Sequence, residues 1–178
     1  MQLRATTLYL VRHGQTAWNL EGRCQGHADI PLDATGIAQA RSLAAALAGH
    51  RIDAIYTSDL ARAHETARIV AAARSATAIA RRALREIDIG SWSGLTDEEI
   101  EVRYPGFVRP DGETDEEHVA RVAAAIAEIV ATHPGEHVLV VSHGQSLEAF
   151  RRHAGMRSRP LRNCEWFTLV ARDGMYRE

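Results

Sequence analysis

The stretch Arg12-His13-Gly14 places a cation, an imidazole and a glycine directly after four apolar residues, 8–11. A short apolar run predicts a buried strand. A strand that turns at a glycine presents its last side chains at the carboxyl edge of the sheet, where open α/β folds bind ligands. An arginine there offers a bidentate fork for phosphate or carboxylate oxygens, and a histidine can attack an electrophile or exchange protons near neutral pH.

A second copy of this pattern lies far along the chain. Residues 139–141 are apolar, and His143-Gly144-Gln145 follows them as His13-Gly14-Gln15 follows the first run. An exposed arginine and a capping histidine would explain one copy equally well. If the two strands are neighbours in one parallel sheet, about 4.8 Å apart, both imidazoles face one pocket, and the repetition favours a shared site.

Arg62 and two carboxylates are further candidates for chemistry. Thr57-Ser58-Asp59 supplies N-cap residue types for a helix that we expect to run to about residue 73, with Arg62 in its first turn. A cation there opposes the helix dipole, so an anion held by Arg62 and the free N–H groups is a better reason for it. Glu86 and Asp88 alternate with isoleucines and are expected on one face, so spacing alone does not choose a proton donor.

These residues lie in motifs that resemble the histidine phosphatase superfamily, the phosphoglycerate mutase-like enzymes. In chain order the motifs are Arg12-His13-Gly14 with Trp18-Asn19, Gly22-Arg23-Cys24-Gln25-Gly26, Ser58-x-Leu60-x-Arg62-Ala63 and Glu86-x-x-x-Gly90-x-Trp92-x-Gly94. They follow the family's order, and the resemblance covers nearly the whole chain.

The resemblance implies a role for each matched residue. His13 would attack phosphorus and form a phosphohistidine, while Glu86, and not Asp88, would donate a proton to the leaving group and then activate water. Arg12, Arg62 and a cationic His143 would surround the phosphoryl oxygens. The residues expected to bind phosphate or substrate are Arg12, Asn19, Gln25, Gly26, Arg62, His143 and Gly144.

The short chain resembles the phosphatase branch, which implies a metal-independent hydrolase of phosphomonoesters that acts on a small phosphorylated metabolite. The alternatives are a cofactor-dependent phosphoglycerate mutase, a phosphohistidine-protein phosphatase and a phosphate-sensing pseudo-enzyme. An intact His13 and Glu86 argue against the pseudo-enzyme. Glu148 departs from a basic residue that relatives often carry, and neither it nor Arg103 nor Arg109 receives a role.

The alternation of strand and helix patterns favours an α/β fold, with three α/β/α layers and a central, mostly parallel sheet. Strands are expected near residues 8–11, 52–56, 77–80, 139–142 and 164–171. Two capping boxes, Thr96 to Glu99 and Thr114 to Glu117, predict the starts of two helices. We expect one domain, 1–178, with a short cap insertion at about residues 95–113.

Composition excludes several functions. The net charge of −2 across 178 residues indicates neither nucleic acid nor a membrane surface as partner. All 21 basic residues are arginine, which rules out Schiff-base and P-loop lysine chemistry. Cys24 and Cys164 are too few for a disulfide framework or a cysteine-rich metal site. The cysteine count favours a cytoplasmic location. The two histidines, two arginines and Glu86 support phosphoryl transfer without a metal, and we expect no cofactor and a monomer or homodimer.

Overall fold

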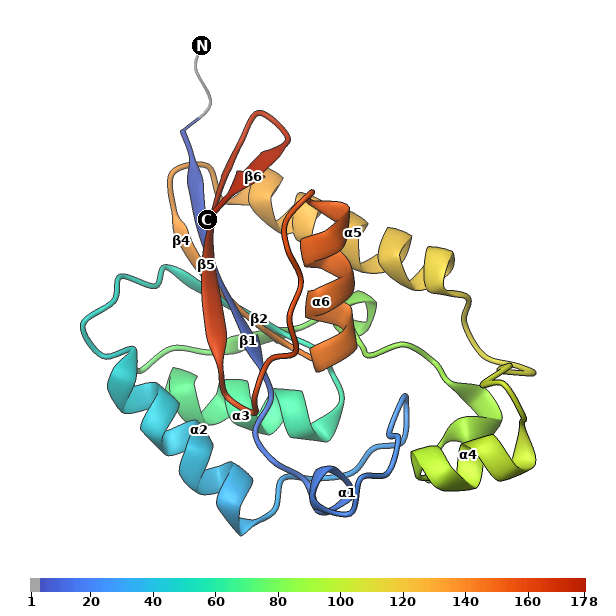
Figure 1. Cartoon of the computed structure of the whole chain (residues 1–178). Helices are drawn as coiled ribbons and strands as arrows, with labels where there is room; N and C mark the ends of the chain where they lie inside the picture. Colours follow the sequence, from blue (N-terminus) through green and yellow to red (C-terminus); the bar gives the residue numbers. More distant parts are fainter. Residues whose placement is uncertain (1–3) are drawn as a thin grey trace.

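The computed structural model describes residues 4–178 as a six-stranded sheet between two layers of helices (Figure 1). The strand order is β3-β2-β4-β1-β5-β6. The parallel strands are β1 (Thr6–Arg12), β2 (Ala54–Thr57), β3 (Ala78–Ala80) and β4 (His137–Ser142), and the antiparallel edge comprises β5 (Trp166–Arg172) and β6 (Met175–Arg177). The expected α/β fold with a mostly parallel sheet is confirmed.

The central strands β1 and β4 are apolar because helices cover both of their faces. In β1, Leu8 and Leu10 belong to the core beneath α5 (Asp115–Thr132) and α6 (Gly144–His153). Tyr9 and Val11 belong to the core beneath α2 (Ala34–Ala46) and α3 (Ala61–Ala72). The two cores lie on opposite faces of the sheet because successive strand side chains alternate.

The register of β1 and β4 sets the distance between the two histidines. Arg12 lies opposite Ser142, and the backbone N–H of His13 donates to the carbonyl of Ser142 over 3.0 Å. The next residue on each strand is therefore a histidine. The prediction that the two His-Gly strand ends are neighbours in one parallel sheet is confirmed.

The helix starts follow the capping predictions at two of three positions. Both capping boxes are formed, at Thr96 for α4 (Asp97–Arg103) and at Thr114 for α5. The N-cap prediction for α3 was wrong, because its N-cap is Leu60, which has no capping side chain. A carboxylate from a distant loop replaces it, since Asp29 Oδ1 accepts from the backbone N–H of Ala61 over 2.6 Å.

Short helical segments complete the chain. They are α1 (Ala17–Leu20), the 3₁₀ turns η1 (Arg82–Leu84) and η2 (Gly90–Trp92), and α4. Across residues 4–178, no helix is both long enough and apolar enough to cross a membrane.

Candidate active site

His13 is held in one orientation at the end of β1. Its Nδ1 lies 2.7 Å from the carbonyl oxygen of Gly14, which can only accept, so Nδ1 carries the proton and Nε2 keeps its lone pair. The backbone N–H of Gly14 donates to Thr66 Oγ1 over 3.0 Å. Burial, and secondly the charge of Arg62, lower the pKa of His13 well below its ordinary value. The ring is therefore neutral, and its lone pair is available for attack.

Arg62 is 1% exposed and reaches the site from the first turn of α3. Its Nη1 and Nη2 donate to the carbonyls of Ala28 and Gly26, each over 2.7 Å. Burial lowers the pKa of Arg62 to about 10, so the guanidinium keeps its charge at neutral pH. Its Nε–H is buried and has no partner among residues 4–178.

Arg12, like Arg62, is an arginine of this site with a buried Nε–H group that no described residue accepts from. Its Nη1 donates to the carbonyl of Leu161 over 2.5 Å, whereas its buried Nε–H has no partner in the part of the chain that the structure describes. A Cβ at Gly144 would lie 3.4 Å from this Nε. Glycine at 144 therefore keeps the space beside the guanidinium open.

His143 is 0% exposed, and its ring centroid lies 5.2 Å from that of His13. Neither of its ring nitrogens has a hydrogen-bond partner among the described residues. Burial, and then the charge of Arg62, lower the pKa of His143 well below its ordinary value, so the protein alone favours the neutral ring, and the expectation of a cationic His143 beside a phosphoryl group stays a prediction. A dianion beside the ring would oppose both effects.

Glu86 and Asp88 occupy different environments. The expected alternation is present, since Ile87 and Ile89 are buried and both acids are partly exposed, but residues 86–89 form no strand and the two acids line different cavities. Glu86 lines the cavity, and its Oε2 accepts from the backbone N–H of Gln145 over 3.1 Å at the start of α6. Asp88 instead accepts from the N–H of Gly90 and lines a separate groove beside His27. Geometry thus distinguishes the two carboxylates, although spacing did not.

Asn19 and Gln25 offer amide donors to the cavity. Asn19 Oδ1 accepts from the backbone N–H of Thr16 and from Asn163 Nδ2, over 3.2 and 3.3 Å. Gln25 Oε1 accepts from Thr16 Oγ1 over 3.1 Å. These bonds occupy the carbonyl oxygens, so Nδ2 of Asn19 and Nε2 of Gln25 are the groups left to donate to a ligand.

The cavity between these residues has a volume of about 290 Å³. Of the residues chosen from the sequence, those lining it are Arg12, His13, Asn19, Gln25, Gly26, Arg62, Glu86 and Gly144, whereas His143 is next to His13 but is not among the lining residues. The lining residues that sequence reasoning did not choose are Arg23, Cys24, Ile89, Trp92, Asp97, Ile100, Arg109, Gln145 and Glu148. Three of these, Asp97, Ile100 and Arg109, come from the expected cap at residues 95–113.

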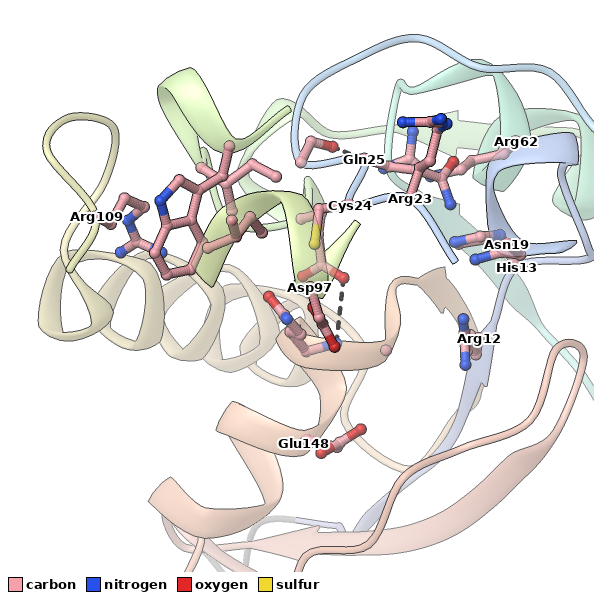
Figure 2. Close-up of a pocket in the computed structure, with 17 residues that line it drawn as sticks. Arg12, His13, Asn19, Arg23, Cys24, Gln25, Arg62, Asp97, Arg109 and Glu148 are labelled. Atoms are coloured by element: carbon pink, nitrogen blue, oxygen red, sulfur yellow. Dashed lines mark hydrogen bonds between the residues drawn. The ribbon is translucent and has the colours of Figure 1, made fainter. Parts of the chain in front are cut away.

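The charges at the outer end of the cavity are unevenly paired. Figure 2 shows Arg109 across the cavity from Arg12, His13 and Arg62. Arg109 lies 5.9 Å from the Trp92 ring centre and 3.3 Å from Asp115, and Arg23 lies 2.9 Å from Glu99. By contrast, neither Asp97 nor Glu148 forms an ion pair with any described residue.

Several supporting residues carried no signal in the sequence. Asn163 donates to the His13 carbonyl over 3.0 Å, and Ser146 Oγ donates to Glu86 Oε1 over 2.8 Å. Only the fold brings these residues to the site, since they lie 150 and 60 positions away along the chain. Within residues 4–178, no group of three histidines, cysteines or carboxylates could hold a metal ion.

The site is thus the carboxyl edge of a parallel sheet in an α/β protein, and it carries two arginines whose buried Nε–H groups have no partner among residues 4–178. The chain belongs to the histidine phosphatase superfamily, branch 1, whose family model matches residues 8–176. The resemblance drawn from the motifs is thereby confirmed.

Similar proteins include both phosphatases and probable mutases. An uncharacterized phosphatase, PhoE of Bacillus subtilis (strain 168), is 39% identical over 144 residues, which cover 81% of this chain and 75% of PhoE. A probable phosphoglycerate mutase, GpmB of Enterobacter sp. (strain 638), is 41% identical over 152 residues, or 79% of this chain and 70% of GpmB.

Two solved structures share the whole fold. YhfR of Bacillus stearothermophilus has a TM-score of 0.89 at 34% identity and covers 97% of this chain and 94% of its own. A mycobacterial glucosyl-3-phosphoglycerate phosphatase in complex with VO3 has a TM-score of 0.88 at 28% identity and covers 96% of each chain.

Proposed function

We propose that this protein is a metal-independent phosphomonoester hydrolase that acts on a small phosphorylated metabolite through a phosphohistidine on His13. The observation that carries the proposal is a set of buried nitrogens near His13 that have no partner in the described part of the chain: Nε of Arg12, Nε of Arg62 and both ring nitrogens of His143. Unpaired buried polar groups are costly. A phosphoryl group with three nonbridging oxygens would supply the missing acceptors.

The first chemical step joins the phosphoryl group to His13. Nε2 attacks phosphorus, the P–N bond forms, and the bond from phosphorus to the leaving oxygen breaks. Arg12 and Arg62 stabilise the charge on the nonbridging oxygens. His143, whose pKa is lowered by burial and by Arg62, takes up a proton from solvent when the dianion lies beside it and adds a third positive charge.

Glu86 donates a proton in the first step and accepts a proton in the second. As the acid it gives its proton to the leaving oxygen, and as the carboxylate it removes a proton from the water that attacks the phosphohistidine. Hydrolysis returns Glu86 to its protonated form and His13 to its neutral form. The cycle needs no redox cofactor.

The outer end of the cavity supports hydrolysis over a mutase reaction on phosphoglycerate. A mutase must hold the carboxylate of phosphoglycerate, yet the outer arginines are engaged with Glu99 and Asp115. Asp97 and Glu148, which also line the cavity, would repel a carboxylate. Asp97 and Gln145, which line the cavity, are exposed, so its outer end is open to water.

The mutase remains the second candidate because relatives with this sequence pattern include GpmB proteins named as probable phosphoglycerate mutases. Incubating the enzyme with p-nitrophenyl phosphate, and then with 3-phosphoglycerate, separates the functions. We expect inorganic phosphate from the aryl ester and little isomerisation of 3-phosphoglycerate. Rapid isomerisation with little phosphate release would favour the mutase, and no turnover of any phosphomonoester would favour a pseudo-enzyme.

A further inference from the structure

Ser146 and His118 form a buried pair next to Glu86: the Ser146 hydroxyl lies 2.9 Å from His118 Nε2 and 2.8 Å from Glu86 Oε1. We propose that Ser146, oriented by His118, is a positioning residue that switches its hydrogen bond as Glu86 changes protonation state. The proposal rests on the proposed function, because it assumes that Glu86 alternates between acid and base. It assigns His118 as a second positioning residue, which acts through Ser146.

The two oxygens of Glu86 are held differently. Oε1 lies within hydrogen-bond distance of the Ser146 hydroxyl (2.8 Å), the Ser146 N–H (3.0 Å) and the Ile87 N–H (3.1 Å). Oε2 accepts only from the N–H of Gln145 among the described residues. With three donors around Oε1, the acid proton belongs on Oε2.

Ser146 has two acceptors for its single hydroxyl proton. Besides Glu86 Oε1, its Oγ lies 3.1 Å from the carbonyl oxygen of Arg85. An ionised Glu86 can accept all three donors at Oε1, whereas the carbonyl oxygen of a protonated carboxyl group is a poorer acceptor. The hydroxyl therefore points to Glu86 when the carboxylate is charged and to Arg85 when it is neutral.

A hydrogen bond from His118 to the Ser146 oxygen leaves the hydroxyl proton of Ser146 free to point only to Glu86 or to the carbonyl of Arg85. His118 Nε2 lies 2.9 Å from Ser146 Oγ. Because the hydroxyl proton is directed to Glu86 or Arg85, the imidazole must be the donor, with its proton on Nε2. Burial lowers the pKa of His118, against the opposing charge of Glu86, and so favours the neutral ring. The other charged groups around the ring are Arg121, Glu113 and Asp115.

The proton count balances without any transfer through Ser146 or His118. In the first step the proton on Glu86 Oε2 goes to the leaving oxygen, and the Ser146 hydroxyl turns from Arg85 to Oε1. In the second step Glu86 takes a proton from water, and the hydroxyl turns back. Each protonation state of the carboxyl group thus keeps its buried neighbours paired, which avoids the cost of an orphaned polar group.

The test compares leaving groups in Ser146→Ala and His118→Leu. An alkyl phosphate needs protonation of its leaving oxygen, whereas p-nitrophenyl phosphate leaves as a stable phenolate. We expect each variant to slow phosphorylation of His13 by the alkyl phosphate about tenfold, the size of one lost buried hydrogen bond. The p-nitrophenol burst should stay within about twofold of wild type.

Two controls separate positioning from loss of packing. His118→Gln keeps an N–H donor near the position of Nε2 and should restore most of the alkyl phosphate rate. Val122→Ala removes buried volume one turn along the same face of α5 without removing a hydrogen bond to Ser146, and should lower the melting temperature without leaving-group dependence. The double variant His118→Leu with Ser146→Ala should be no slower than Ser146→Ala alone, because the residues act in series.

The outcomes for the pair and for the proposed function are distinct. If wild type forms no phosphohistidine, the proposed function is wrong. If wild type forms it but Ser146→Ala slows both substrates equally, or neither, the switch is wrong. Ser146→Ala deletes a single oxygen, so it provides this result even if His118→Leu does not fold.

Discussion

Glu86 sits with both carboxylate oxygens against N–H groups at the start of α6, whereas the carboxylate of Asp88 is turned toward Gly90. If Glu86 is the general acid, Glu86→Gln should slow alkyl phosphates by roughly 10²–10⁴-fold. Phosphorylation of His13 by p-nitrophenyl phosphate should change much less. The later hydrolysis would still lack a base, so a burst of p-nitrophenol followed by slow turnover is the expected trace.

Asp88→Asn is the matched control, because it changes a carboxylate two residues away that does not line the cavity. It should leave both substrates near wild-type rates. Leaving-group dependence in Asp88→Asn, and none in Glu86→Gln, would show that Asp88, and not Glu86, is the general acid.

At the scale of single residues, the sequence predicted the cavity-lining positions of Arg12, His13, Arg62 and Glu86 through local motifs. It could not predict the lowered pKa of His143, which depends on complete burial and on Arg62 from another element. Nor could it find Ser146 as a partner of Glu86, because that contact spans 60 positions. Local spacing identifies reactive side chains, but their environment comes from tertiary packing.

Helix α2 meets the loop that follows β1 at two glycines, Gly14 and Gly36. A Cβ at Gly36 would lie 2.1 Å from the carbonyl oxygen of Gln15, a backbone atom that cannot rotate away. Gly36→Ala should therefore push α2 from the loop that follows His13. We expect a loss of about 1–3 kcal/mol in the free energy of unfolding, typical of overpacking, and a lower kcat.

Urea unfolding and turnover of p-nitrophenyl phosphate would measure this effect. Gly49→Ala is a suitable control beyond the end of the same helix, since a Cβ there would meet nothing within 4 Å. Similar stability of the two variants would show that the contact of Gly36 with Gln15 is not tight.

Among the elements, prediction succeeded where the signal is local. The capping boxes at Thr96 and Thr114 each lie within four residues, and both are formed. The start of α3 failed for the opposite reason, because the acceptor for Ala61 comes from Asp29, 32 positions earlier. The parallel pairing of β1 with β4 was predicted because two similar motifs ended both strands.

The stability of the whole molecule should depend on pH through its buried histidines. The pKa values of His13 and His143 are lowered in the folded state, whereas in the unfolded chain they are near 6.5. Below about pH 6.5 the unfolded chain thus binds protons that the folded chain does not, and stability falls as the pH decreases. Each such histidine contributes up to about 1.4 kcal/mol per pH unit in that window.

Urea denaturation between about pH 5 and 7 would measure this slope. Carboxylates with lowered pKa values, such as Asp59 and Glu65, add a slope of the same sign near the acid end of this window, because their ordinary pKa values are 3.8 and 4.5, so a histidine variant is needed to identify the contribution of the histidines. His143→Asn should reduce the slope. A free energy of unfolding that is constant or rises as the pH falls from 6.5 to 5 would contradict the assigned pKa directions.

The enzyme should remain active when EDTA removes divalent metal ions. Arg12, Arg62 and, once phosphate is bound, His143 provide the positive charge that a divalent cation would otherwise bring. We expect EDTA to leave turnover unchanged and vanadate to inhibit. A loss of activity in EDTA that Mg²⁺ restores would contradict the proposed mechanism.

Covalent labelling of His13 is the most direct measurement. Wild-type enzyme mixed with a ³²P-labelled phosphomonoester and quenched in alkali should retain label that acid releases and base does not, as expected for a phosphohistidine. His13→Ala should retain none and should lose turnover. Label that persists in His13→Ala, or that survives acid in the wild type, would show that the nucleophile is another residue.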